Sequence, residues 1–144
     1  MSIIAIITAI GAASPVFTEP SFLLFLLSAM LGYGVLWSMS FLFQMFSFWL
    51  LNVWAIMTLK NVFINVLSGS MIPLWFMPEI VRKIIGFTPF DSIYFTPVQI
   101  YLGNISGSEL ALGFVKQLIW IAVLLIFGFI LWNKGKKKLV VQGG

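Results

Sequence analysis

The 144-residue chain is 61% hydrophobic and only 8% charged, and it contains neither cysteine nor histidine. Because a soluble domain normally carries about a quarter charged residues, this composition predicts an integral membrane protein. Without cysteine or histidine the chain lacks disulfides, thiolate metal ligands and the commonest general base. We therefore expect no metal site, no cofactor and no enzyme activity.

Long apolar runs separated by short polar segments predict an all-α, polytopic membrane protein with about four transmembrane helices. All of it forms one transmembrane domain, residues 1–144. The expected spans cover residues 3–17, 21–45, 48–69 and 109–132. Residues 70–107 are expected to form two short re-entrant or interfacial helices, and residues 133–144 a cytoplasmic tail.

Small residues recur every four positions in the second expected span, as Ser28 with Gly32 and as Gly34 with Ser38. This spacing allows another helix to approach closely in lipid. The partner helix either belongs to the same fold or comes from a second subunit.

Polar side chains follow helical spacing in the third expected span. Thr58, Asn61, Asn65 and Ser68 share one face and are the candidate residues of a substrate path. The alternative is that Asn61 and Asn65 hold this helix to a neighbour by hydrogen bonds. Lys60 is either buried near mid-membrane or interfacial, depending on where the helix begins.

The stretch after the third span is apolar but cut by Pro73, Pro78, Pro89 and Pro97. Proline-interrupted apolar segments beside a bilayer indicate short helices shielded by protein. Residues 79–87 predict an amphipathic helix, with Glu79 and Lys83 as an ion pair and Ile80, Ile84 and Phe87 on one face. Asp91 is expected to cap the next segment.

Several lysines follow the last apolar run, and the positive-inside rule predicts that this end is cytoplasmic. This cytoplasmic anchor consists of Lys134, Lys136, Lys137 and Lys138. Since the lysines adjoin a membrane span, we expect them to face the lipid bilayer and no nucleic acid. Lys116, within the last span, is expected to extend outward to water.

Several short pieces occur in an order that matches a known family. They are Phe48-Trp49, Leu67-Ser68-Gly69, Ile72-Pro73-Leu74, Met77-Pro78, Thr88-Pro89-Phe90, Tyr94-Phe95-Thr96-Pro97, Ile100-Tyr101-Leu102-Gly103, Gln117, Trp120, Leu131-Trp132 and Gly143-Gly144. In this order they resemble the C-terminal half of permease subunits of ABC-2 type exporters, in particular a six-span bacterial subfamily.

The resemblance implies a subunit of the bacterial plasma membrane, paired with a second permease subunit and with cytoplasmic ATPase subunits. It also implies that Ser68, Gly69, Pro73 and Pro78 shape a first dip into the outer leaflet, and Pro89, Phe90 and Pro97 a second. The candidate gate residues are Gly69, Pro73, Pro78, Pro89, Phe90 and Pro97. Such permeases carry earlier spans and a cytoplasmic loop, so we expect this chain to be the C-terminal part of a longer permease.

The chain has no phosphate-binding glycine loop, so ATP hydrolysis would belong to a partner. The leading hypothesis is a permease subunit, or a fragment of one, that forms part of the path of an ATP-driven exporter. The alternative is a small four-span membrane protein without transport activity, acting as an assembly or immunity partner or remaining as a truncated remnant.

Overall fold

The computed structural model of the protein describes residues 19–46, 49, 53–72 and 74–142. Its helices are α2 (Glu19–Phe46), α3 (Val53–Leu67), the 3-10 helix η2 (Leu74–Phe76), α4 (Glu79–Gly86), α5 (Phe95–Tyr101) and α6 (Ser108–Gln142). These described ranges contain no strand, which confirms the expected all-α class. The expected span at residues 3–17 lies outside the described residues.

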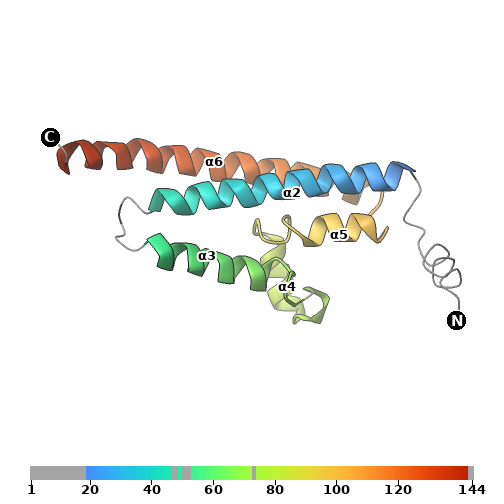
Figure 1. The fold of residues 1–144 in the computed structure, drawn as a ribbon. Helices are drawn as coiled ribbons and strands as arrows, with labels where there is room; N and C mark the ends of the chain where they lie inside the picture. The colour runs from blue at the N-terminus through green and yellow to red at the C-terminus, as the bar shows by residue number, and fades with distance from the viewer. Residues whose placement is uncertain (1–18, 47–48, 50–52, 73, 143–144) are drawn as a thin grey trace, which may run out of the picture.

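Helices α2 and α6 are the two long elements and lie side by side, running in the same direction (Figure 1). With 28 and 35 residues they are about 40 and 50 Å long, which exceeds the ~30 Å hydrocarbon core of a bilayer. In their most apolar windows only 28% and 17% of the residues are buried inside the molecule. Most of their apolar surface therefore faces outward, as in a helical membrane protein.

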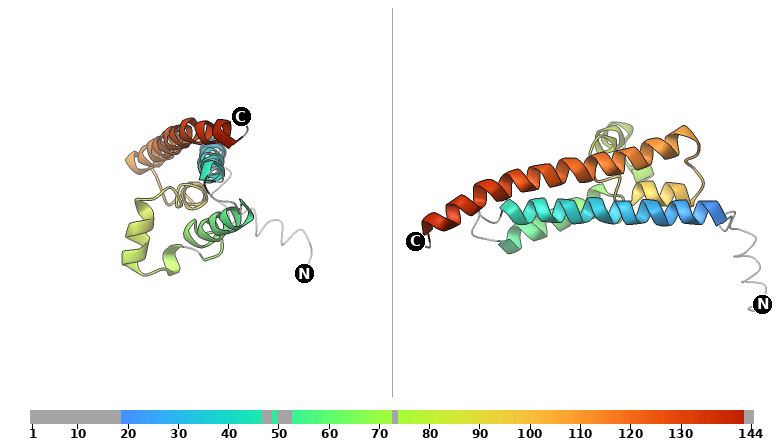
Figure 2. Two further views of the ribbon diagram at one scale, coloured as in Figure 1. Left: turned by 90° about the vertical axis from the view of Figure 1, so that its left-hand side faces the viewer. Right: turned by 90° about the horizontal axis from the view of Figure 1, so that it is seen from above.

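The core lies where α2 meets α6, α3 and the turn before α5, which covers residues 87–94. Its buried side chains are Val35, Met39, Ile64, Ile93 and Leu124. Each of the three elements contributes to this one cluster, so α2 is the helix against which the others pack. In the end-on view of Figure 2, α5 lies next to the α2 and α6 pair, with α3 and α4 farther out.

Helix α6 continues beyond the span expected at residues 109–132, through the lysine-rich segment to Gln142. Lysine, leucine and glutamine are good helix formers, and no proline interrupts this segment. Lys134, Lys136 and Lys137 are exposed on this extension, and Lys138 belongs to the same helix. They lie at the end of the molecule where α2 ends and α3 begins (Figure 1).

The described helix α3 covers residues 53–67 of the span expected at residues 48–69, of which residues 48 and 50–52 lie outside the described part of the chain. Its 15 residues make it about 22 Å long, less than the hydrocarbon thickness. Gly69 follows it with φ of +83°, a left-handed conformation that glycine adopts without steric cost. The chain turns there, and a Cβ atom at this position would lie 3.3 Å from Cγ of Leu74.

Two short helices, α4 and α5, connect α3 to α6. Helix α4 begins after Pro78, which has the extended φ and ψ of −52° and 146°. The expected ion pair forms, with Lys83 Nζ 2.9 Å from Glu79 Oε1. The expected apolar face is fully outward, because Ile80, Ile84 and Phe87 are all exposed.

Pro97 was expected to interrupt the second short segment, and this is wrong. It is buried in the first turn of α5, where a residue needs no intrahelical N–H bond. The helix therefore runs without a break from Phe95 to Tyr101, and the ring of Tyr101 contacts that of Phe25 near the start of α2, with centroids 5.1 Å apart.

Candidate functional site

Three of the four candidate path residues share the outward face of α3. Thr58, Asn61 and Asn65 are exposed, and their side chains have no hydrogen bond within the described part of the chain. Ser68 is separated from them, because it is fully buried; among the described residues its hydroxyl finds no hydrogen-bond partner. Within the described residues, Asn61 and Asn65 therefore do not hold α3 to a neighbouring helix by hydrogen bonds.

The opposite face of α3 packs against α2. Ile56 and Ile64 are buried there, and Ile64 belongs to the core. Lys60 lies on the same side, half-buried, and its Nζ donates to Ser40 Oγ on α2 at 2.9 Å. Thus the lysine, and not the two asparagines, makes the polar contact between α3 and α2.

A buried polar junction joins α2, α6 and the turn before α5, and Gln117 is its centre. Gln117 Nε2 donates to the carbonyl oxygens of Ser28 at 3.0 Å and Ser92 at 2.9 Å. Ser28 Oγ donates in return to Gln117 Oε1 at 3.2 Å. All three residues are fully buried. One amide group therefore connects three elements inside the membrane protein.

Gly32 allows the same turn to reach the middle of α2. A Cβ atom on Gly32 would lie 2.5 Å from the carbonyl oxygen of Ile93 and 3.1 Å from that of Ser92. For the pair Ser28 and Gly32, the helix-packing alternative is therefore the one that the fold uses. A second subunit is not needed to explain their spacing.

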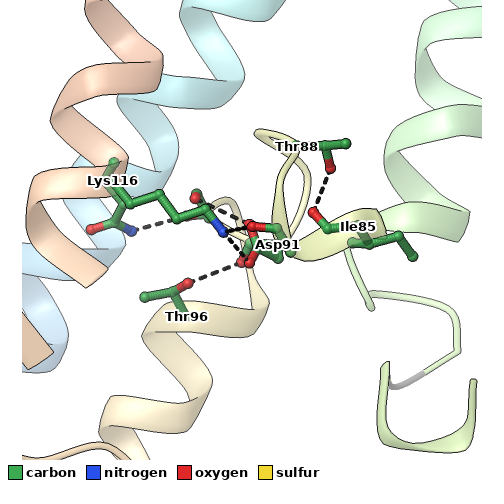
Figure 3. Close-up of polar contacts among 8 residues, drawn as sticks. Ile85, Thr88, Asp91, Thr96 and Lys116 are labelled. Atoms are coloured by element: carbon green, nitrogen blue, oxygen red, sulfur yellow. Dashed lines mark hydrogen bonds and ion pairs between the residues drawn. The ribbon is translucent and has the colours of Figure 1, made fainter. Parts of the chain in front are cut away.

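An ion pair closes the junction on the side of α4 (Figure 3). Lys116 Nζ on α6 lies 2.5 Å from Asp91 Oδ2 and also donates to the carbonyl oxygen of Gly86. The side chains are 28% and 12% exposed, so the charges are largely shielded from water. The expectation that Lys116 extends outward to water is wrong, because a carboxylate is close enough to pair with it.

Asp91 does not cap α5 with its side chain, contrary to expectation. Its main-chain carbonyl accepts hydrogen bonds from the amide and the hydroxyl of Thr96, at 2.9 and 3.2 Å. The carboxylate faces Lys116 and accepts from Ser92 Oγ at 3.2 Å. Burial raises the pKa of Asp91 above its ordinary value, while Lys116 acts in the opposite direction.

The candidate gate residues occupy different positions around this junction. Pro89 is buried and its carbonyl accepts from the Ser92 amide at 3.2 Å, while Phe90 packs on the core. Pro78 precedes α4, and Pro97 lies within α5. Pro73 lies outside the described residues. The described candidate gate residues thus lie in or beside the connecting segments and add no polar side chain to the junction.

Sequence reasoning named Ser28, Asp91, Lys116 and Gln117 separately but did not predict that they meet in one junction. A signal was present, because Lys116 and Gln117 are adjacent polar residues inside an apolar run, and such residues usually face the protein interior. Within the described ranges no group of three or more acidic side chains is placed to hold a metal ion.

These features are those of a helical membrane protein: the long helices are apolar and expose most of their surface, and the short connecting segment is held to them by buried polar groups. A family model described as "ABC-2 family transporter protein" matches residues 1–143. The chain therefore belongs to the ABC-2 transporter family and is a membrane permease of that type. No curated protein and no solved structure matches the chain.

Proposed function

We propose that this permease chain forms part of the translocation path of an ATP-driven exporter in the bacterial plasma membrane, with its C-terminus in the cytoplasm. ATP hydrolysis is supplied by cytoplasmic ATPase subunits. The observation that carries the proposal is the exposed polar face of α3, formed by Thr58, Asn61 and Asn65. It occurs in a chain of a transporter family.

An unpaired amide in hydrocarbon costs several kcal/mol, about 4 or more on scales that allow no compensating hydrogen bond. The face of α3 that bears Asn61 and Asn65 is therefore poorly suited to contact lipid. It is suited to a water-filled path or to a second permease subunit across that path. Ser68 is no longer a path candidate, since it is buried inside the chain.

The junction supplies the fixed side of the path. Gln117 and Lys116 attach the turn before α5 to α6, and Gly32 places it against α2. We infer that α2, α5 and α6 move together as one body. ATP binding on partner subunits then rocks two permease chains between inward-open and outward-open arrangements, and the region of α4 and α5 closes the outer end.

The test is export by the complete complex in cells carrying Asn61→Leu or Asn65→Leu. We expect export to fall several-fold with membrane insertion unchanged, since leucine removes the amide but suits a helix. Val62→Leu, another exposed position of α3, is the matched control and should export normally. Unchanged export in both asparagine variants refutes the path. Purification of a stable monomer that never retains an ATPase subunit would favour the alternative of a membrane protein without transport activity.

A further inference from the structure

Lys60 is a charged residue that belongs neither to the polar junction nor to the polar face of α3. Its Nζ donates to Ser40 Oγ at 2.9 Å, and Ser40 in turn donates to the carbonyl oxygen of Leu36 at 2.9 Å. An ammonium group has three N–H donors, so two remain for another acceptor. The ion pairs within the described ranges are Glu79 with Lys83 and Asp91 with Lys116, and neither includes Lys60.

A small cavity adjoins this contact. It has a volume of about 70 Å³ and is lined by Trp37, Ser40, Phe41 and Gln44. A water molecule occupies about 30 Å³ in the liquid, so the cavity suits a small polar group and not a drug-sized ligand. The rings of Trp37 and Phe41 are stacked, with centroids 6.0 Å apart and planes 8° apart, and they form an apolar wall beside it.

The position of the cavity indicates where a ligand comes from. Ser40 lies about 9 Å along α2 from the helix end at Phe46, at 1.5 Å per residue. That end is also the lysine-rich end of α6 (Figure 1), where Lys134, Lys136 and Lys137 are exposed. Clusters of lysine beside a membrane span attract anionic lipid headgroups. The half-buried Lys60 is thus within reach of the leaflet with the most anionic character.

We propose that Lys60 and Ser40 form a binding site for the phosphate group of a phospholipid from the leaflet at the lysine-rich end. Lys60 supplies the positive charge and the free N–H donors. The stacked rings of Trp37 and Phe41 contact the lipid next to its phosphate. The phosphate of the bound lipid occupies the cavity beside Ser40 on α2 and supplies the counter-ion that Lys60 lacks.

The proposal is tested with the full chain in nanodiscs that contain phosphatidylglycerol and phosphatidylcholine, by counting retained lipid with native mass spectrometry. We expect Lys60→Gln to weaken retention of phosphatidylglycerol about tenfold, because a charge-assisted hydrogen bond is lost. Lys60→Arg should retain it. The matched control is Lys83→Gln, which removes the same charge from an exposed position on α4 and should have no effect.

Three results would overturn the proposal. Equal losses in Lys60→Gln and Lys83→Gln would show that only the overall charge matters. Loss in Lys60→Arg as well as in Lys60→Gln would show that lysine acts in folding and not as a cation. Displacement of the lipid by millimolar inorganic phosphate would show that the site binds free phosphate.

Discussion

Gly32 and Ile93 approach so closely that a Cβ atom on the glycine would lie 2.5 Å from the carbonyl oxygen of the isoleucine. This contact places the turn before α5 halfway along α2, next to Ser28 and Gln117. The polar junction depends on that approach, because Gln117 spans from Ser28 on α2 to Ser92 in the turn.

Gly32→Ala should therefore destabilise the protein by about 2 kcal/mol, a typical cost of overpacking. The backbone of the turn must move, since the clashing atom belongs to the main chain. The measurement is the free energy of unfolding in detergent micelles. Gly86→Ala is the matched control, because a Cβ atom there has nothing within 4 Å. Equal stability of the two variants would contradict the close approach.

The ion pair between Lys116 and Asp91 should show coupling in a double-mutant cycle. Each of Lys116→Met and Asp91→Asn should cost about 2 kcal/mol, because each leaves a shielded charge without its partner. The double variant should be more stable than the sum of the single losses predicts, by about 1 kcal/mol. The cycle is measured by unfolding in micelles. Strict additivity would show that the two charges do not interact.

Gln117→Leu should cost about 2 kcal/mol, because it leaves the buried polar groups of Ser28 and Ser92 without a partner. Asn61→Leu makes a similar amide-to-leucine change at an exposed position and should leave stability nearly unchanged. Thermal unfolding in micelles distinguishes them. If Asn61→Leu were the more destabilising variant, the face of α3 that bears Asn61 would be the one packed against the protein.

Local features of this protein were predictable from the chain alone. The ion pair of Glu79 with Lys83 and the start of α4 after Pro78 depend on neighbours within one helical turn. Likewise, the paucity of charge was enough to place the chain among helical membrane proteins. By contrast, the apolar pattern did not predict that helix α6 continues beyond the expected span to Gln142, since helix length also depends on the good helix formers beyond the last apolar residue.

The sequence by itself determined that this chain is helical and belongs in a membrane, because composition and helical spacing act locally, and its short motifs carried the resemblance to its family. Only the tertiary structure decided that Lys116 meets Asp91, 25 positions away, and that Gln117 meets Ser28, 89 positions away. It also decided that Asn61 faces outward while Lys60 faces α2. Lipid is as apolar as a protein core, so hydrophobicity cannot tell which face of a membrane helix points inward, and packing must decide it.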